Sequence, residues 1–280
     1  MSAPVVFYAW QNDRPREITR DSRDFIHKAA DEAIHRAGSR MRLEDSPRLD
    51  HDTKNEAGSP PIAETILRKI KHSAIIIADL TCCSEIKEEG PQGKVKKKNP
   101  NPNVMLELGY GAAVMGWNRV ILVMNDKYGG PSWLPFDLKN HRFPITYELG
   151  PNSAKGPEVM EELIDELEQQ IRGCLMAEYD LVDATLARLS SHSRFIMKKH
   201  GPSDVFFEKR IGKEPEEEEQ RQNRIATVMD LSIALMLELN VIHCVDAVNE
   251  LGVGYTFTYL GKQCCYRLGV LLRVPGNRRV

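Results

Sequence analysis

Two short apolar runs constrain the fold of this chain more than any other feature. Ala74–Asp79 and Arg119–Met124 consist mostly of β-branched and other apolar residues, which is typical of strands buried on both faces of a parallel sheet. A similar run, Val5–Trp10, precedes them, and segments with helical spacing lie between the three. Because parallel strands need long crossover connections, this order predicts an α/β fold with a doubly wound parallel sheet over residues 1–175.

Apolar spacing predicts the helices that connect these strands. The first extends from Phe25 to a stop at Gly38, and the second opens after Pro61 and ends near His72. A third begins at Asn103, the expected N-terminal cap, and ends at Gly116. The fourth spans Val159–Ile171 and completes the domain.

Three further segments of the first domain receive weaker predictions. A short strand is expected near Met41–Leu43, and an edge strand over Arg142–Tyr147, because Pro144 is tolerated only at an edge. The charged insertion Cys82–Asn101 is interpreted as a mobile loop over the site, or as solvated surface.

Residues 176–280 are expected to form a smaller, helical, winged-helix-like domain. A helix over Leu181–Lys199 precedes a charged stretch, and a hairpin with a final helix follows residue 241. Residues 225–261 contain no Lys or Arg, so DNA binding is not expected, because phosphate contacts supply most of the affinity for DNA. A regulatory module for dimerisation or sensing and a plain helical cap both remain open.

Composition excludes several classes of protein. The formal net charge of -2 gives no electrostatic reason to expect nucleic acid. No apolar run approaches the roughly 18 residues that span a bilayer, and the N-terminus does not resemble a secretion signal. The six cysteines lack a metal-binding spacing. We therefore expect a cytoplasmic protein with reduced thiols, no membrane association, no metal and no bound cofactor.

Two acidic residues occupy positions that favour chemistry. Asp79 falls at the carboxyl end of a predicted buried strand, where open α/β sheets bind their ligands. Glu107 follows in the first turn or so of the next predicted helix, where the helix dipole favours a negative charge. Each has a structural alternative, since Asp79 could cap the following turn and Glu107 could be a solvated acid.

The chain also resembles a known family. The stretches that carry the resemblance are Phe7–Asp13, Asp52-Thr53, Gly58–Ile62, Asp79–Thr81, Asn101–Tyr110 and Leu134–Asp137. They resemble the TIR-like proteins of bacterial antiphage defence and, more distantly, the nucleoside 2-deoxyribosyltransferases. The resemblance covers roughly residues 4–150, and the Asn101–Tyr110 block is its most specific part.

This resemblance implies a flavodoxin-like, TIR-like domain that cleaves an N-glycosidic bond. The substrate would be NAD+ in the TIR-like case, with Glu107 as the catalytic carboxylate, Asp79 orienting the substrate and a homo-oligomer forming on activation. A deoxynucleoside is the substrate in the transferase alternative, and a non-enzymatic nucleotide sensor or scaffold is a third possibility. The expected substrate-binding residues are Tyr8, Trp10, Gln11, Asp13, Gly58, Asn103 and Tyr110, although each could instead serve a turn, a cap or the core.

Overall fold

The structure is a computed structural model. It describes residues 3–10, 19–42, 47–52, 61–90, 93–139, 144–201, 206–208, 231–239, 241–249 and 252–268. The chain divides into two compact units. One unit is Ala3–Glu178, and the other contains the described residues from Tyr179 onward. The predicted division into domains 1–175 and 176–280 stays a prediction.

A five-stranded parallel sheet forms the centre of the first unit. Its order, β2-β1-β3-β6-β7, is the flavodoxin-like order of a doubly wound sheet. The α/β fold class predicted from the sequence is therefore confirmed. In this order the chain reverses its direction of growth between β1 and β3, where ligands bind in such sheets. The strands are β1 (Val5–Ala9), β2 (Arg48–Asp50), β3 (Ile75–Asp79), β6 (Val120–Asn125) and β7 (Ile145–Tyr147).

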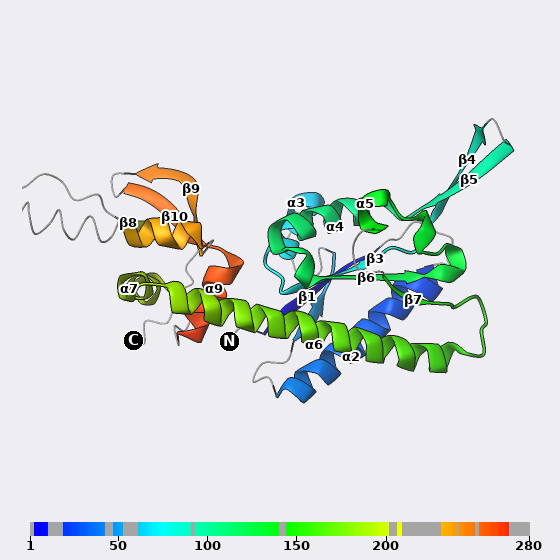
Figure 1. Cartoon of the computed structure of the whole chain (residues 1–280), viewed down its shortest axis with the longest axis horizontal. Coiled ribbons are helices and arrows are strands. Elements are labelled where there is room, and N and C mark those ends of the chain that lie inside the picture. Colours follow the sequence, from blue (N-terminus) through cyan, green and yellow to red (C-terminus); the bar gives the residue numbers. More distant parts are fainter. Residues whose placement is uncertain are drawn as a thin grey trace, which may run out of the picture. The chain divides into compact units, whose positions relative to one another are not determined.

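Helices cover both faces of the sheet (Figure 1). On one face lie α2 (Phe25–Met41) and α6 (Gly156–Arg188), and on the other lie α3 (Ile62–Lys71), α4 (Pro102–Met115) and α5 (Phe136–Lys139). Alternate strand residues, including Phe7, Ile76, Ala78 and Leu122, form one core cluster with Leu108 of α4. Because successive side chains of a strand point to opposite faces, Tyr8 and Asp79 belong to the face of α2 and α6.

The start of α4 differs from the sequence prediction. Asn101, not Asn103, is the N-cap, and its side chain accepts hydrogen bonds from the backbone N–H groups of Asn103 and Val104. Pro102 then occupies the first helical position, where its missing N–H is not needed. Glu107 consequently lies in the second turn of α4 and not in the first. Gly116 ends the helix with a φ of 83°, as predicted.

Two predictions around α2 are wrong. Gly38 does not stop the helix, which continues to Met41 and ends at Arg42 with a left-handed φ of 52°. Gly38 is buried, and a Cβ at this position would lie 2.8 Å from Pro47 Cδ, so close packing explains the glycine. The short strand expected near Met41–Leu43 is wrong at Met41, which belongs to α2, and at Arg42, which caps it, whereas Leu43 lies outside the described residues. The strand described after α2 is Arg48–Asp50.

The insertion that was predicted to be a loop is a β-hairpin. Its strands, β4 (Ser84–Gly90) and β5 (Gly93–Asn99), pair antiparallel from Ser84↔Asn99 to Gly90↔Gly93. The hairpin extends away from the central sheet (Figure 1).

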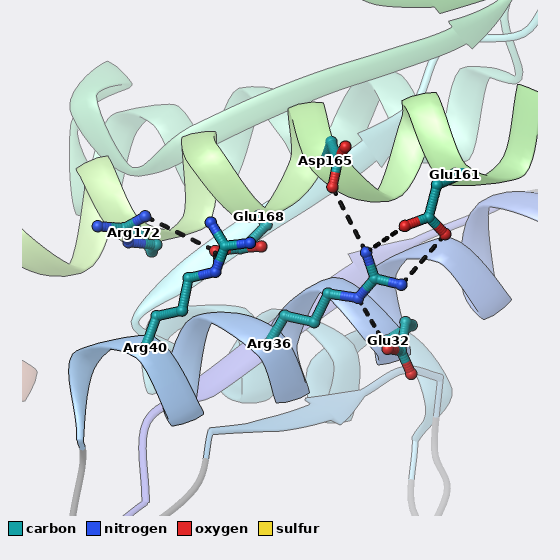
Figure 2. A network of polar contacts seen from close by, with 7 residues as sticks. All are labelled: Glu32, Arg36, Arg40, Glu161, Asp165, Glu168 and Arg172. Atoms are coloured by element: carbon teal, nitrogen blue, oxygen red, sulfur yellow. Dashed lines mark hydrogen bonds and ion pairs between the residues drawn. The ribbon is translucent and has the colours of Figure 1, made fainter.

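A network of ion pairs joins α2 to α6 (Figure 2). Arg36 binds both carboxylate oxygens of Glu161, at 2.6 and 3.1 Å, and also binds Glu32 at 2.8 Å. Glu168, which is buried, lies within 3.1 Å of Arg40 Nε and 3.7 Å of Arg172 Nη1. Every acidic group drawn there has a cationic partner, although three arginines face four carboxylates.

The second unit contains helices and a small antiparallel sheet. The sheet order is β8-β10-β9, formed by β8 (Phe206–Glu208), β9 (Ile242–Asn249) and β10 (Gly252–Phe257). Its helices include α7 (Ser191–His200), residues 231–238 and α9 (Tyr259–Arg267). The predicted hairpin and final helix are thus present. The helix expected over Leu181–Lys199 is interrupted, because α6 ends at Arg188 and Ser190 caps α7.

Candidate functional site

The central sheet separates the predicted site residues into two groups. Tyr8 of β1, Asp79 of β3 and Trp10, which follows β1, lie on the side of α2. Asn103, Glu107 and Tyr110 belong to α4 on the opposite side. Gln11, Asp13 and Gly58 lie outside the described residues. The structure therefore offers two places for chemistry, which we call the Glu107–Asp52 pair and the Trp10 pocket.

Glu107 is a partly buried carboxyl on the second turn of α4. Gly111, one turn further along, brings this helix close to β3, because a Cβ there would lie 3.1 Å from Ile76 Cδ1. Burial first, and then the negative charge of Asp52, raise the pKa of Glu107 to about 7. Among the described residues no cation offsets these two effects, so the site disfavours a second negative charge and favours a positive one.

Asp52 reaches this position through an unusual backbone conformation. It lies two residues after the end of β2 and has a φ of 53°, in the left-handed region that few non-glycine residues adopt. Its neighbour Asp50 is fixed by Lys69 of α3, with Nζ 3.0 Å from Oδ1 and both side chains buried. This buried ion pair anchors the end of β2 beside α3 and defines where the turn begins.

Asp79 is completely buried at the end of β3. Its Oδ1 accepts a hydrogen bond from the backbone N–H of Thr81 at 2.9 Å, which is the turn-capping geometry that the sequence had left as an alternative. Within the described part of the chain Oδ2 has no hydrogen-bond partner. Burial raises the pKa of Asp79 to about 6, although the bonds from Thr81 oppose the shift.

Two tyrosines of the sheet hold the start of α2, which is the π-helical turn η1 (Arg20–Asp24). The Tyr8 hydroxyl donates to the carbonyl of Arg23 at 3.2 Å, and the Tyr147 hydroxyl donates to that of Asp21 at 2.8 Å. Burial and the charge of Asp79 raise the pKa of both tyrosines. Because Asp79 is completely buried, a substrate-orienting role for it would require the surrounding residues to move.

The Trp10 pocket is a cavity of about 860 Å³ between η1, the first turn of α2 and the start of α6. The guanidinium of Arg23 lies 4.8 Å from the centre of the Trp10 ring. His51 stands edge-on to Trp10 and to His27, with ring centroids 6.1 and 5.3 Å apart respectively. The pocket thus combines aromatic rings with charged groups, as small-molecule sites do.

The two remaining predicted residues on α4 have ordinary surroundings. Asn103 is exposed and forms part of the first turn. Tyr110 is partly buried and packs against the core cluster that contains Leu108.

Three residues at these two places, Asp52, Arg23 and His51, received no role from the sequence. Asp52 had been noted only within the family resemblance, and Arg23 and His51 had not been considered. The dipeptide His51-Asp52 after a short strand was an available signal, because acids at strand ends deserve the same attention as Asp79. Nothing in the sequence indicated that Arg23 lies on Trp10.

The described residues provide no obvious metal site and no membrane span. No group of three or more His, Cys, Asp or Glu side chains in this part of the chain could hold a metal ion. None of the helices over the described ranges has the length and apolar character needed to cross a bilayer.

Comparisons with known proteins agree only on general architecture. No family model matches the chain, and no curated protein matches it either. Among solved structures, the chain is similar to the crystal structure of a flavodoxin-like domain from Synechococcus sp, with 15% identity and a TM-score of 0.31. This match covers 60% of the present chain and 96% of the other. At this level the match adds nothing to the strand order described above.

Proposed function

We propose that the first unit cleaves the N-glycosidic bond between nicotinamide and ribose in NAD+. The observation that carries the proposal is the Glu107–Asp52 pair, in which two carboxyls share a partly buried environment near the carboxyl end of the sheet. Such a pair favours a cationic guest, and the nicotinamide ring of NAD+ is a cation. The TIR-like resemblance at Asn101–Tyr110 supports the same assignment, and it implies an effector of antiphage defence that is activated by assembly.

The proposed chemistry assigns one role to each carboxyl. Departure of nicotinamide creates an oxocarbenium-like ribose, and the ionised Glu107 stabilises or captures this positive charge before water completes hydrolysis. Asp52 adds negative potential at the same place. Nicotinamide leaves as a neutral molecule without being protonated, so no separate general acid is required.

A second candidate is transfer of a deoxyribosyl group between bases. It is supported by the pKa of about 7 for Glu107, since a fraction of the carboxyl is then protonated at neutral pH and can donate a proton. Asp79 is a poor second acid for this reaction, because it is buried on the opposite face from α4.

The test compares wild type with Glu107→Gln and with Glu161→Gln, an exposed control in the α2–α6 network. NAD+ loss and nicotinamide release are followed by chromatography, with and without a crowding agent that promotes assembly. We expect Glu107→Gln to lose at least about 100-fold in rate, by analogy with removal of one transition-state contact, and Glu161→Gln to retain activity.

A parallel reaction contains deoxyadenosine and free cytosine in place of NAD+. Formation of deoxycytidine without NAD+ loss would select the transferase. No turnover of either substrate by demonstrated oligomers would contradict both enzymatic assignments and leave the nucleotide-sensing or scaffold role.

A further inference from the structure

The Trp10 pocket is a cavity whose lining residues differ in charge and ring content from the Glu107–Asp52 pair. Its volume of about 860 Å³ lies within the roughly 300–1,000 Å³ range of small-molecule pockets. Glu107 and Asp79 are not among its lining residues. The rings that line it are those of Tyr8, Trp10, His27 and His51, beside charged residues of η1 and the first turn of α2.

The charges in this lining favour an anion. Both acids are engaged by the preceding arginine: Arg20 binds Asp21 at 2.9 Å, and Arg23 binds Asp24 at 2.7 Å. Lys28 lies on the exposed surface of α2, and within the described ranges no acid pairs with it. Three basic and two acidic side chains therefore leave a positive excess, before any protonation of the two histidines.

The rings of the lining favour a planar ligand. Trp10, His51, His27 and Tyr8 follow one another as an uninterrupted series of ring contacts, with centroid separations between 5.3 and 6.2 Å. Arg23 lies over Trp10 and presents a second flat, cationic surface on which a heterocycle can stack. The Glu107–Asp52 pair offers the opposite preference, for positive charge.

We propose that the Trp10 pocket binds an anionic compound with a planar heterocycle, of the size of a nucleoside monophosphate, independently of Glu107. The heterocycle lies against Trp10 and Arg23, and the anionic group is neutralised at Lys28. This inference goes beyond the proposed function. It assigns Tyr8 and Trp10, which the family resemblance implies for the NAD+ substrate, to a separate pocket whose lining contains neither Glu107 nor Asp52.

The experiment is calorimetric titration of the full chain with AMP, adenosine and ribose 5-phosphate. AMP should bind at least about tenfold more tightly than either fragment, since only AMP satisfies both halves of the pocket. Trp10→Ala and Lys28→Glu should each weaken AMP binding at least tenfold. Trp117→Ala and Lys198→Glu are the matched controls outside the pocket, and Glu107→Gln should bind AMP as wild type does.

Three results would overturn the inference: no saturable AMP binding at millimolar concentration, equal affinity for adenosine and AMP, or binding that Glu107→Gln abolishes and Lys28→Glu leaves intact. Lys28 is exposed, so Lys28→Glu decides the matter even if Trp10→Ala fails to fold. Failure of NAD+ cleavage with intact AMP binding would reject the proposed function alone.

Discussion

Two glutamates of the first unit show how the same side chain is adapted to opposite purposes. Glu161 lies in the network between α2 and α6, where the guanidinium of Arg36 lowers its pKa below the usual value. Glu107 lies on α4, where burial and Asp52 raise its pKa to about 7. Arg36 thus favours the ionised form of Glu161. Glu107, in contrast, has a pKa close to neutral pH, where it exchanges a proton readily.

The difference in pKa distinguishes an acid that joins two helices, Glu161, from an acid proposed to act in catalysis, Glu107. In the α2–α6 network each acid has an arginine beside it, which holds two helices together and gives an incoming ligand little to bind. Burial and the charge of Asp52 disfavour the ionised form of Glu107, and a cationic group that binds there relieves this cost. Carboxyls with a raised pKa are therefore the better guide to a site.

The largest expected effect is the pH dependence of NAD+ cleavage. In the proposed reaction Glu107 acts in its ionised form, so kcat/KM should fall about tenfold for each pH unit below its pKa and level off above it. In Asp52→Asn the pKa of Glu107 should be lower, and the acidic limb of the profile should move to lower pH. A profile measured between pH 5 and 9 checks this, and an identical midpoint in wild type and Asp52→Asn would contradict it.

The next effect concerns stability at Asp79. Its pKa of about 6 in the folded protein exceeds the ordinary value of 3.8, so folding favours the protonated form and stability falls as the pH rises from about 4 to about 6. Asp79→Asn keeps an acceptor for the Thr81 N–H and removes the charge. We expect it to raise the free energy of unfolding by about 1–3 kcal/mol at pH 7.5, and by almost nothing near pH 4.

Urea unfolding followed by tryptophan fluorescence measures this change for the first unit alone, because all three tryptophans, Trp10, Trp117 and Trp133, lie within Ala3–Glu178. Asp165→Asn, at an exposed member of the α2–α6 network, is the control and should show no such gain. A loss of stability in Asp79→Asn at pH 7.5 would refute the interpretation.

The smallest effect is expected in the α2–α6 network. Arg36→Ala should lower the urea midpoint slightly at low salt, and the difference should shrink in about 1 M sodium chloride, because exposed ion pairs are weak and screened. NAD+ cleavage should not change. A salt-independent loss would indicate that Arg36 acts through packing of its aliphatic stem.

The sequence predicted the central strands of the sheet better than the edge strand β2 and the end of α2. The buried strands β3 and β6 were recognisable because both their faces are covered and their residues are uniformly apolar. The three residues of β2 carry no such signal, and they form a strand because Arg48, Leu49 and Asp50 pair with β1. Likewise, the packing of Gly38 against Pro47 could not be seen from helix propensity.

The site was harder to predict for a related reason. When both faces of a strand are buried, apolar residues do not reveal which side chains share a face. The sequence placed Asp79 and Glu107 at the same edge of the sheet, but the alternation that directs Ala78 toward α4 directs Asp79 away from it. The N-cap was predictable in principle, because Pro102 is favoured at the first helical position and therefore identifies Asn101.

The left-handed backbone of Asp52 has a consequence for laboratory evolution of this protein. Glycine adopts a φ of 53° without strain, so Asp52→Gly would relieve the backbone while deleting the charge beside Glu107. A library selected only for heat resistance would thus be enriched in this substitution, and a library selected for turnover would be depleted of it. The frequency of Asp52→Gly should therefore rise in the first library and fall in the second. The difference would show how much thermal stability the protein loses by keeping an acid at this position.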